Sequence, residues 1–568
     1  MRKGTDNGKY SVHAIAGTYV ITLSFDAKPE HIDRLLGFAI HRTEYDNGQI
    51  HEEYWLKGYK PFEEVVKNPQ PGVKYSTHEH PIQSFMWGDF TVKPGTTYEY
   101  KIVPVSGKPK KLEYEPELIV KVTTEPLSDS LHEIHFNRAV AASQAYAEKF
   151  DNKKPNDAGL SNTEKEERLA WLSRGLFEAI CSFIRQAKDP DYGIRAAIYE
   201  LDYPGVVSVF KEAADHSDVK IIYEARKGLT QTKQNENALT TAGFKLNDRK
   251  ITFARTDTVG IPHNKFIVLL YKNDPVMVWT GSTNLSEGGI FGHANVGHCI
   301  KDPGLANEYL KYWNLLKDDP DKTSLANKIS KQWPDNKILN DLSNGKISAV
   351  FSPRKGFKML DSYADVFSDA GKMANITFPF NLDKRFIEKI EEQSAALRFI
   401  ILNSGKKNIS LAEQLNPDPD VVIAPGSKID KEWHQWLNEI HSGLNGANVL
   451  YIHTKFLLKD PLGPLPLVIT GSANFSEPST NKNDENMVLI PCSNEEGKTR
   501  VQDIYLGEFF RLFDHLYFRY LHSMNQSDDE DDRKRCFLKT DPKEWVTSYF
   551  TAGTDKFKRR EIFTWGFH

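Results

Sequence analysis

Two stretches of the chain carry the same reactive residue types at the same intervals. Residues 263 to 284 are HNKFIVLLYKNDPVMVWTGSTN, and residues 453 to 474 are HTKFLLKDPLGPLPLVITGSAN. The matched positions differ by a constant 190, which is 453 minus 263. A histidine can attack phosphorus or transfer a proton, and lysine, serine and asparagine can bind a phosphate. The repeat therefore predicts chemistry at a phosphate group.

Each copy is expected to build a phosphate cradle. In a strand, residues two apart share a face, so His263 lies beside Lys265 and His453 beside Lys455. The apolar run after each lysine predicts an antiparallel hairpin that returns a Gly-Ser turn toward the histidine. The residues predicted to bind phosphate are Lys265, Ser282 and Asn284 in the first copy and Lys455, Ser472 and Asn474 in the second.

Two histidines suit one reaction at a phosphodiester. One imidazole attacks phosphorus, and the other protonates the leaving oxygen from the opposite side. Two copies that face each other across a pseudo-twofold axis would supply both, so we expect one active site that is complete within a single chain.

The other histidines and the cysteines give no sign of a metal site. Cys181, Cys299, Cys492 and Cys536 lack the spacing of a disulfide framework or a zinc site. His293, His298 and the HEIH at 132 to 135 lack the spacing of a metal-binding motif, and a core or surface role is the simpler interpretation.

The paired His-x-Lys and Gly-Ser-x-Asn motifs resemble the phospholipase D superfamily over about residues 165 to 525. The resemblance implies a metal-independent phosphodiesterase that forms a covalent phosphohistidine and needs no cofactor. It implies that His263 is the nucleophile and that His453 acts first as acid and then as base. In the second copy, Asp460 and Glu485 stand at the family's carboxylate positions, where they would orient a histidine or stabilise the fold.

The first copy departs from the family pattern. Leu270 stands where the aspartate belongs, and Ala294 is taken as the counterpart of Glu485. Which of the two imidazoles is held by a carboxylate therefore stays open. A catalytically silent scaffold that binds nucleic acid or protein is one alternative function.

The elements that must position these residues divide the chain into four parts. Residues 1–126 alternate in polarity and are predicted to form a β-sandwich; KPGTTYEYKIV, at 93 to 103, resembles a fibronectin type III run in which a tyrosine folds back onto the corner. Such a module suits a protein partner. A helical linker is expected at 127–164, a first phospholipase D-like domain at 165–335, and a second with a C-terminal extension at 336–568.

Both phospholipase D-like parts show the pattern of an α/β fold. IRAAIYEL, VVSVFKEAADH and VKIIYEAR predict a strand, a helix and a strand of a mostly parallel sheet, and ISAVFSPR begins a similar series. The predicted fold class is multidomain: an all-β sandwich followed by two α/β domains that form a pseudo-twofold pair.

The overall composition does not identify the substrate, so the positions of individual charged residues have to indicate it. The 568 residues carry a net charge of −4, which gives no general attraction to polyanions. Basic residues do follow the predicted strand ends, where open α/β sheets bind ligands, and they favour a nucleic acid, DNA first. These residues are Arg226, Lys227, Arg354, Lys355, Lys358, Lys406 and Lys407. A phospholipid is the alternative substrate, although the sequence lacks a secretory signal or a membrane-spanning apolar run, which favours a cytoplasmic protein.

Overall fold

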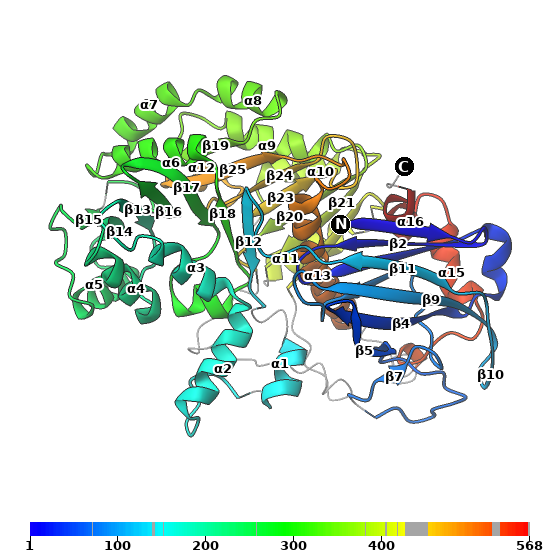
Figure 1. Ribbon diagram of the computed structural model, residues 1–568. Helices are drawn as coiled ribbons and strands as arrows, with labels where there is room; N and C mark the ends of the chain where they lie inside the picture. The colour runs from blue at the N-terminus through cyan, green and yellow to red at the C-terminus, as the bar shows by residue number, and fades with distance from the viewer. Residues whose placement is uncertain are drawn as a thin grey trace.

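The computed structural model describes residues 1–70, 72–138, 143–151, 153–256, 258–380, 382–403, 406–416, 418–426, 452–524 and 534–565. Strands form the N-terminal region, and two α/β halves follow, each built on a seven-stranded sheet (Figure 1). Within the described ranges, no helix combines the length and apolar character needed to cross a membrane.

Two antiparallel sheets pack face to face in the N-terminal region. Their inward side chains alternate with outward ones and share one apolar core, as expected for a sandwich. The first sheet has the order β1 (Arg2–Asp6), β2 (Tyr10–Ala16), β3 (Ile21–Ala27) and β8 (Met86–Asp89). The second has the order β10 (Lys111–Tyr114), β9 (Thr97–Lys108), β4 (Gly37–Asp46) and β5 (Gln49–Trp55), with β11 (Leu118–Thr123) also on β9.

A tyrosine of β9 closes the corner of this sandwich. The hydroxyl of Tyr98 accepts a hydrogen bond from the backbone N of Lys93 at 2.9 Å and contacts Glu44 at 3.2 Å. Tyr98 is fully buried, so these bonds satisfy a hydroxyl that has left water.

The end of the described chain returns to the sandwich. Helices α15 (Lys543–Phe550) and α16 (Asp555–Trp565) lie against it at one end of the molecule (Figure 1). The ring of Trp545 stacks on Phe85 with 5.4 Å between centroids, and the carbonyl of Phe563 accepts a hydrogen bond from Ser24. The C-terminal extension that we assigned to the second α/β domain therefore completes the sandwich core instead.

The first α/β half contains a mixed sheet. Its strand order is β12 (His132–Phe136), β18 (Val296–Ile300), β17 (Asp274–Gly281), β16 (Lys265–Tyr271), β13 (Tyr192–Ile198), β14 (Asp218–Glu224) and β15 (Thr252–Arg255). Only β13, β14 and β15 run parallel. The prediction of a mostly parallel sheet was wrong, because the motif hairpin β16–β17 adds to β13 in antiparallel fashion.

The second half repeats this topology. Its order is β19 (Ser348–Ser352), β25 (Glu485–Pro491), β24 (Leu467–Gly471), β23 (Phe456–Lys459), β20 (Met373–Phe378), β21 (Leu397–Leu402) and β22 (Val421–Pro425). Numbered within each half, both orders are 1-7-6-5-2-3-4. The repeated unit therefore begins at β12, inside the interval 127–164 that was expected to be a helical linker.

Helices cover the first sheet on one face, and the second half covers the other. One face packs on α2 (Asn162–Ser173), α3 (Leu176–Arg185), α4 (Pro204–Ala214) and α5 (Thr230–Thr241). The other face shares a core with α6 (Pro303–Leu316), the second half and α13 (Arg500–Met524). Strand β16 up to Leu270 and the second half of β17, from Val278, are buried on both faces, which explains the nearly continuous apolar sequence of β16.

The remaining described helices lie around these sheets. They are α1 (Ser143–Phe150), α7 (Lys322–Gln332), α8 (Asp335–Ser343), α9 (Lys358–Ser368), α10 (Lys384–Glu391), α11 (Lys406–Leu415) and α12 (Glu477–Asn481). Helix α13 connects the second half to the sandwich through the ion pair of Asp503 with Arg2 at 2.6 Å, and to the first half through that of Glu508 with Arg174 at 2.5 Å.

Candidate active site

His263 is held by a carboxylate from the other half of the molecule. It lies two residues before β16, and its Nδ1 is 2.9 Å from Oε2 and 3.0 Å from Oε1 of Glu485, the first residue of β25. The backbone N of His263 donates to the carbonyl of Asp484 at 2.9 Å. The Ser472 hydroxyl bonds to Oε2 of Glu485 at 2.7 Å, so this carboxylate is itself fixed.

His453 is held in the same way by an amide from the first half. Its Nδ1 is 3.0 Å from Oδ1 of Asn295, and its backbone N donates to the carbonyl of Ala294 at 3.0 Å. Oδ1 of Asn295 also accepts a bond from the Ser282 hydroxyl at 2.7 Å, while its Nδ2 donates to the carbonyl of Gly289 at 2.7 Å.

The constant offset of 190 corrects one assignment made from the sequence. Residues 295 and 485 differ by 190 and make matching contacts, so Asn295 is the counterpart of Glu485. Ala294 is instead the counterpart of Asp484, and both contribute a backbone carbonyl to the histidine of the opposite half. The error arose because the loops before β18 and β25 differ in composition and were aligned one residue out of register.

The orienting residues also fix where each imidazole carries its proton. A carboxylate accepts hydrogen bonds, so Nδ1 of His263 must be the donor to Glu485. The Asn295 amide donates through Nδ2 to Gly289, which leaves Oδ1 as the acceptor for Nδ1 of His453. Both neutral histidines therefore keep an unprotonated Nε2, the atom needed for attack on phosphorus or for proton transfer.

The two rings face each other across a short distance. The ring centroids of His263 and His453 are 6.4 Å apart, with an interplanar angle of 75°. A reacting phosphorus about 3 Å from each imidazole nitrogen fits a separation of this order. Tyr199 forms one wall of this space, because its ring centroid is 5.0 Å from that of His263 and its ring lies 5.3 Å from the Lys265 Nζ.

Two buried ammonium groups accompany the histidines. The Lys265 Nζ donates to the carbonyl of His263 at 2.7 Å, and the Lys455 Nζ donates to that of His453 at 2.6 Å. Lys265 is 2% exposed and Lys455 is fully buried, and neither forms an ion pair within the described part of the chain. Uncompensated buried charge is costly, so this arrangement favours an anion between the two halves.

Burial perturbs the pKa of all four groups, and repulsion from neighbouring lysines adds to it at His263, His453 and Lys455. Burial lowers the pKa of Lys265 to about 8 against the attraction of Glu485, and burial together with Lys265 lowers the pKa of Lys455 well below its ordinary value. Burial lowers the pKa of His263 to about 4, again against Glu485. Burial and then Lys455 lower the pKa of His453 well below its usual range. A bound anion would reverse these shifts.

The serines do not occupy the positions predicted for phosphate ligands. Ser282 and Ser472 are fully buried, and each hydroxyl both donates to the orienting residue and accepts from a backbone N, of Val296 at 3.1 Å and of Asn486 at 3.0 Å. They position Asn295 and Glu485 rather than face a ligand.

The two asparagines of the motif are placed differently from each other. Asn284 donates through Nδ2 to Oε2 of Glu200 at 2.7 Å, so this donor is directed at a carboxylate and not at a phosphate. The Oδ1 atoms of Asn284 and Asn474 are buried and have no hydrogen-bond partner among the described residues. The predicted phosphate contact of Asn474 stays a prediction.

Asp460 and Glu485 have separate functions. Asp460 lies at the far end of β23 with φ at 44°, and its carboxylate accepts bonds from the backbone N of Gly371, Lys372 and Met373 at 2.8, 2.7 and 3.1 Å. It stabilises the start of β20 and does not contact a histidine. Leu270, its counterpart, is a buried core residue of β16, so the first half lacks this turn contact but loses nothing at the site.

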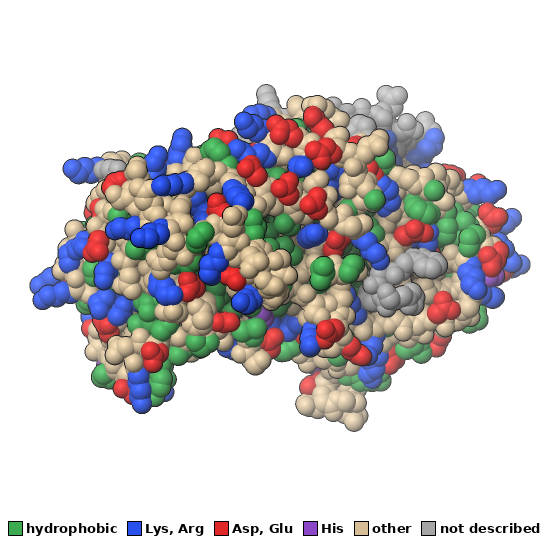
Figure 2. Space-filling view, turned by 90° about the horizontal axis from the view of Figure 1, so that it is seen from above, with side chains coloured by type: hydrophobic (Ala, Val, Ile, Leu, Met, Phe, Trp, Pro, Cys, Tyr) green, Lys and Arg blue, Asp and Glu red, His purple; other side chains and the backbone are tan. Residues whose placement is uncertain are grey.

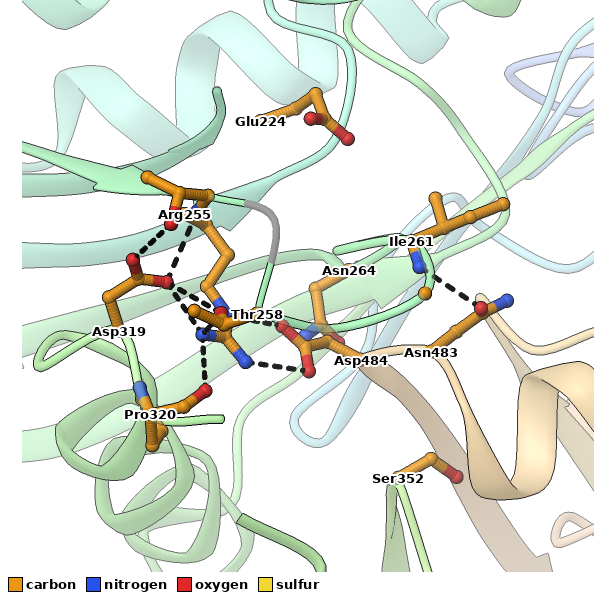
Figure 3. A network of polar contacts seen from close by, with 12 residues as sticks. Glu224, Arg255, Thr258, Ile261, Asn264, Asp319, Pro320, Ser352, Asn483 and Asp484 are labelled. Carbon is orange, nitrogen blue, oxygen red and sulfur yellow. Dashed lines mark hydrogen bonds and ion pairs between the residues drawn. The ribbon is translucent and has the colours of Figure 1, made fainter. Parts of the chain in front are cut away.

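A buried ion pair braces the His263 side. Arg255 at the end of β15 bonds to Asp484 through Nε at 2.7 Å and through Nη2 at 3.3 Å, and its Nη1 contacts Asp319 and Thr258 at 2.7 and 2.6 Å (Figure 3). Although burial opposes it, the Asp484 carboxylate raises the pKa of Arg255 above its usual value. The network fixes the residue whose carbonyl binds His263.

The predicted basic patch is only partly present. Arg354 is buried and pairs with Asp335 at 2.5 Å, so the prediction that it faces a nucleic acid was wrong. Arg226 is partly exposed and pairs with Glu224 at 2.9 Å, and its contact with a nucleic acid stays a prediction. Strand-end position alone cannot separate a structural arginine from a ligand-binding one. The exposed members are Lys227, Lys355, Lys358 and Lys407; the side chain of Lys406 lies outside the described part.

Two residues near the site were not predicted to belong to it. Asn295 was missed because its counterpart Glu485 is acidic, and residue type alone does not match an amide to a carboxylate. The His293 ring lies 5.6 Å from that of His453, although its spacing had favoured a core or surface role. The constant offset would have identified Asn295; no spacing signal identified His293.

No protein-family model and no curated protein matches the sequence. Similar solved structures include a polyphosphate kinase from Porphyromonas gingivalis, at 11% identity and a TM-score of 0.37, which covers 55% of this chain and 46% of its own. A phosphatidylserine synthase from Haemophilus influenzae has 16% identity and a TM-score of 0.41, with 64% of this chain and 90% of the other covered. The chain spans about half of the polyphosphate kinase.

Nuc from Salmonella typhimurium, a phospholipase D family member, is also similar. It has 23% identity and a TM-score of 0.20, and the match covers 24% of this chain and 83% of Nuc. All three TM-scores lie below 0.5, so a function has to be argued from the residues of this chain.

Proposed function

We propose that the protein is a phosphodiesterase that needs no metal and acts through a covalent phosphohistidine on His263. The observation that carries this proposal is the 6.4 Å separation of two imidazoles that are each held through Nδ1, next to two buried ammonium groups that form no ion pair with the described residues. Together these groups provide a nucleophile, a proton donor and positive charge for the phosphate.

The reaction proceeds in two steps. Nε2 of neutral His263 attacks phosphorus, the bond from phosphorus to the leaving oxygen breaks, and protonated His453 gives its Nε2 proton to that oxygen. Neutral His453 then takes a proton from water, the water oxygen attacks phosphorus, and the bond from phosphorus to His263 breaks. Lys265 and Lys455 neutralise the charge on the phosphoryl oxygens in both steps.

The two orienting residues favour this division of roles. A carboxylate on Nδ1 stabilises the positive charge that His263 gains when it becomes phosphorylated, whereas a neutral amide on His453 leaves its proton easier to lose. The negative charge of a bound phosphodiester raises the pKa of His453, so the imidazole takes up a proton from solvent before the first step.

A nucleic acid, DNA first, is the proposed substrate. Its support is the set of exposed lysines that follow strands in both halves, Lys227, Lys355, Lys358 and Lys407. The face in Figure 2 shows basic side chains interspersed with acidic ones, so any track for a phosphate backbone is local. The lipid alternative is therefore retained as an outcome of the test.

The test is cleavage of end-labelled single- and double-stranded DNA in excess EDTA. We expect cleavage by the wild type and by His216→Ala, which removes an exposed histidine in the turn before β14, and none by His263→Ala. Cleavage of phospholipid vesicles but not of DNA would replace the nucleic acid with a lipid. Failure of the wild type on both would leave a silent scaffold.

A further inference from the structure

A third imidazole lies beside the two histidines of the motifs. The ring centroid of His293 is 5.6 Å from that of His453, at an interplanar angle of 45°. His293 directly follows the π-helical turn η3 (Gly288–Gly292), an irregular element that is frequent at functional sites. The site thus contains a row of three rings, with His453 in the middle.

The backbone of His293 is fixed by the same contacts that position Asn295. Its N donates to the carbonyl of Gly288 at 2.8 Å, and its carbonyl accepts from Nδ2 of Asn137 at 2.8 Å. Oδ1 of Asn137 accepts from the backbone N of Asn295 at 2.9 Å. The loop that orients His453 therefore also holds His293 in place.

The surroundings of the His293 ring determine its tautomer. Its Nδ1 is buried and has no hydrogen-bond partner among the described residues. A buried N–H without an acceptor is rarer and costlier than a buried lone pair without a donor, so the proton belongs on Nε2. Burial lowers the pKa of His293 to about 4, which keeps the ring neutral near pH 7. His293 as a whole is partly exposed to solvent, although its Nδ1 atom is buried.

The other half has no such ring. The counterpart of His293 at the offset of 190 is Asn483, whose Oδ1 accepts from the backbone N of Ile261 at 3.1 Å and whose Nδ2 contacts Glu485 at 3.4 Å. Asn483 supports the orienting carboxylate, whereas His293 makes no corresponding bond to Asn295. His293 therefore adds an imidazole N–H beside His453, and its counterpart Asn483 adds no imidazole beside His263.

We propose that His293 is a third catalytic imidazole, which donates its Nε2–H to an oxygen of the anion bound between His263 and His453. This inference rests on the proposed function, because it assigns a contact to the same phosphate. The donor lies on the side where the leaving oxygen gains negative charge, and a fixed neutral donor there stabilises the transition state.

The experiment compares His293→Gln, His293→Asn and His293→Phe with the wild type. A glutamine amide places its nitrogen where Nε2 of histidine lies, an asparagine amide reaches only the Nδ1 position, and phenylalanine keeps the ring without a donor. Sulfate binding is measured by calorimetry at pH 7, and kcat/KM is measured on the substrate that the wild type cleaves. Thermal melts identify the folded variants.

The expected result is sulfate affinity within about 3-fold of the wild type for His293→Gln and about 10-fold weaker binding for His293→Asn and His293→Phe. kcat/KM follows the same order. Equal sulfate affinity of all four proteins overturns the inference. So does an equal loss of sulfate affinity in the glutamine and asparagine variants. The absence of sulfate binding by the wild type also overturns it. If phenylalanine prevents folding, the comparison of glutamine with asparagine decides.

Sulfate binding requires no turnover, so the two proposals fail separately. A wild type that cleaves no phosphodiester but shows the expected order of sulfate affinities contradicts the proposed function and supports the role of His293. A wild type that cleaves DNA while all variants bind sulfate equally contradicts only the role of His293.

Discussion

Nδ1 of His263 lies 2.9 Å from Oε2 of Glu485, although the two residues are 222 positions apart. The matching contact joins His453 to Asn295 at 3.0 Å over 158 positions. Each half therefore orients the histidine of the other, so the proposed site is complete only when the two halves are paired. The carboxylate on one side and the amide on the other make the two imidazoles chemically different.

This difference predicts that substitutions of the two orienting residues affect the reaction differently. Glu485→Gln removes the carboxylate that stabilises charged His263, and we expect kcat to fall about 10²-fold. Asn295→Asp gives His453 a carboxylate and raises its pKa, so the alkaline limit of kcat should shift to higher pH. Both are measured in pH–rate profiles, with Asn237→Asp, at an exposed asparagine of α5, as the control. Identical profiles for the Asn295→Asp variant and the wild type would contradict the proposed roles.

Replacing a site lysine should stabilise the fold. The folded-state pKa of Lys265, about 8, lies below the ordinary lysine value, so burial of its charge opposes folding at pH 7. We expect Lys265→Met to raise the free energy of unfolding by about 1–3 kcal/mol at pH 7 and to abolish activity. The gain should shrink as pH rises toward the unfolded-state pKa. Lys233→Met, at an exposed lysine, is the control in urea denaturation.

Anion binding should weaken as pH rises. Because Lys265 loses its proton above about pH 8 in the free site, and because a bound anion raises its pKa, sulfate binding takes up a proton in this range. We expect the affinity to fall about 5-fold between pH 8 and pH 9. Calorimetry in buffers of different ionisation enthalpy measures the proton uptake. An affinity that is flat across this interval would count against two charged lysines at the phosphate.

Arg255 and Asp484 should stabilise the fold only when both are present. Arg255→Met leaves a buried carboxylate without its partner and should cost roughly 3–5 kcal/mol of stability. Arg255→Met combined with Asp484→Leu removes both charges and should recover most of that loss. Urea denaturation of the two single variants and the double variant measures the coupling. Additive losses would show that the pair is not coupled.

Part of this site could be predicted from the sequence, because the residues that indicate it lie close together in the chain. The hairpins β16–β17 and β23–β24 form as predicted, since the apolar runs and turns lie next to each other in the chain. Glu485 and Asn295 each orient the histidine of the opposite half, and these contacts join residues that are far apart in the sequence. The edge strand β12 has only five residues and a composition that resembles the helical segment after it. Arg354 was mistaken for a ligand residue because burial decides its role.

The most direct test of the central claim is a burst experiment with bis(4-nitrophenyl) phosphate, whose leaving group needs no acid. His453→Ala should release about one equivalent of nitrophenol per site and then stall, because the base for hydrolysis is absent. Mass spectrometry of the quenched protein should find the phosphoryl group on His263. His263→Ala should give neither burst nor adduct. An adduct on His453, or a burst that survives His263→Ala, would contradict the assignment of His263 as the nucleophile.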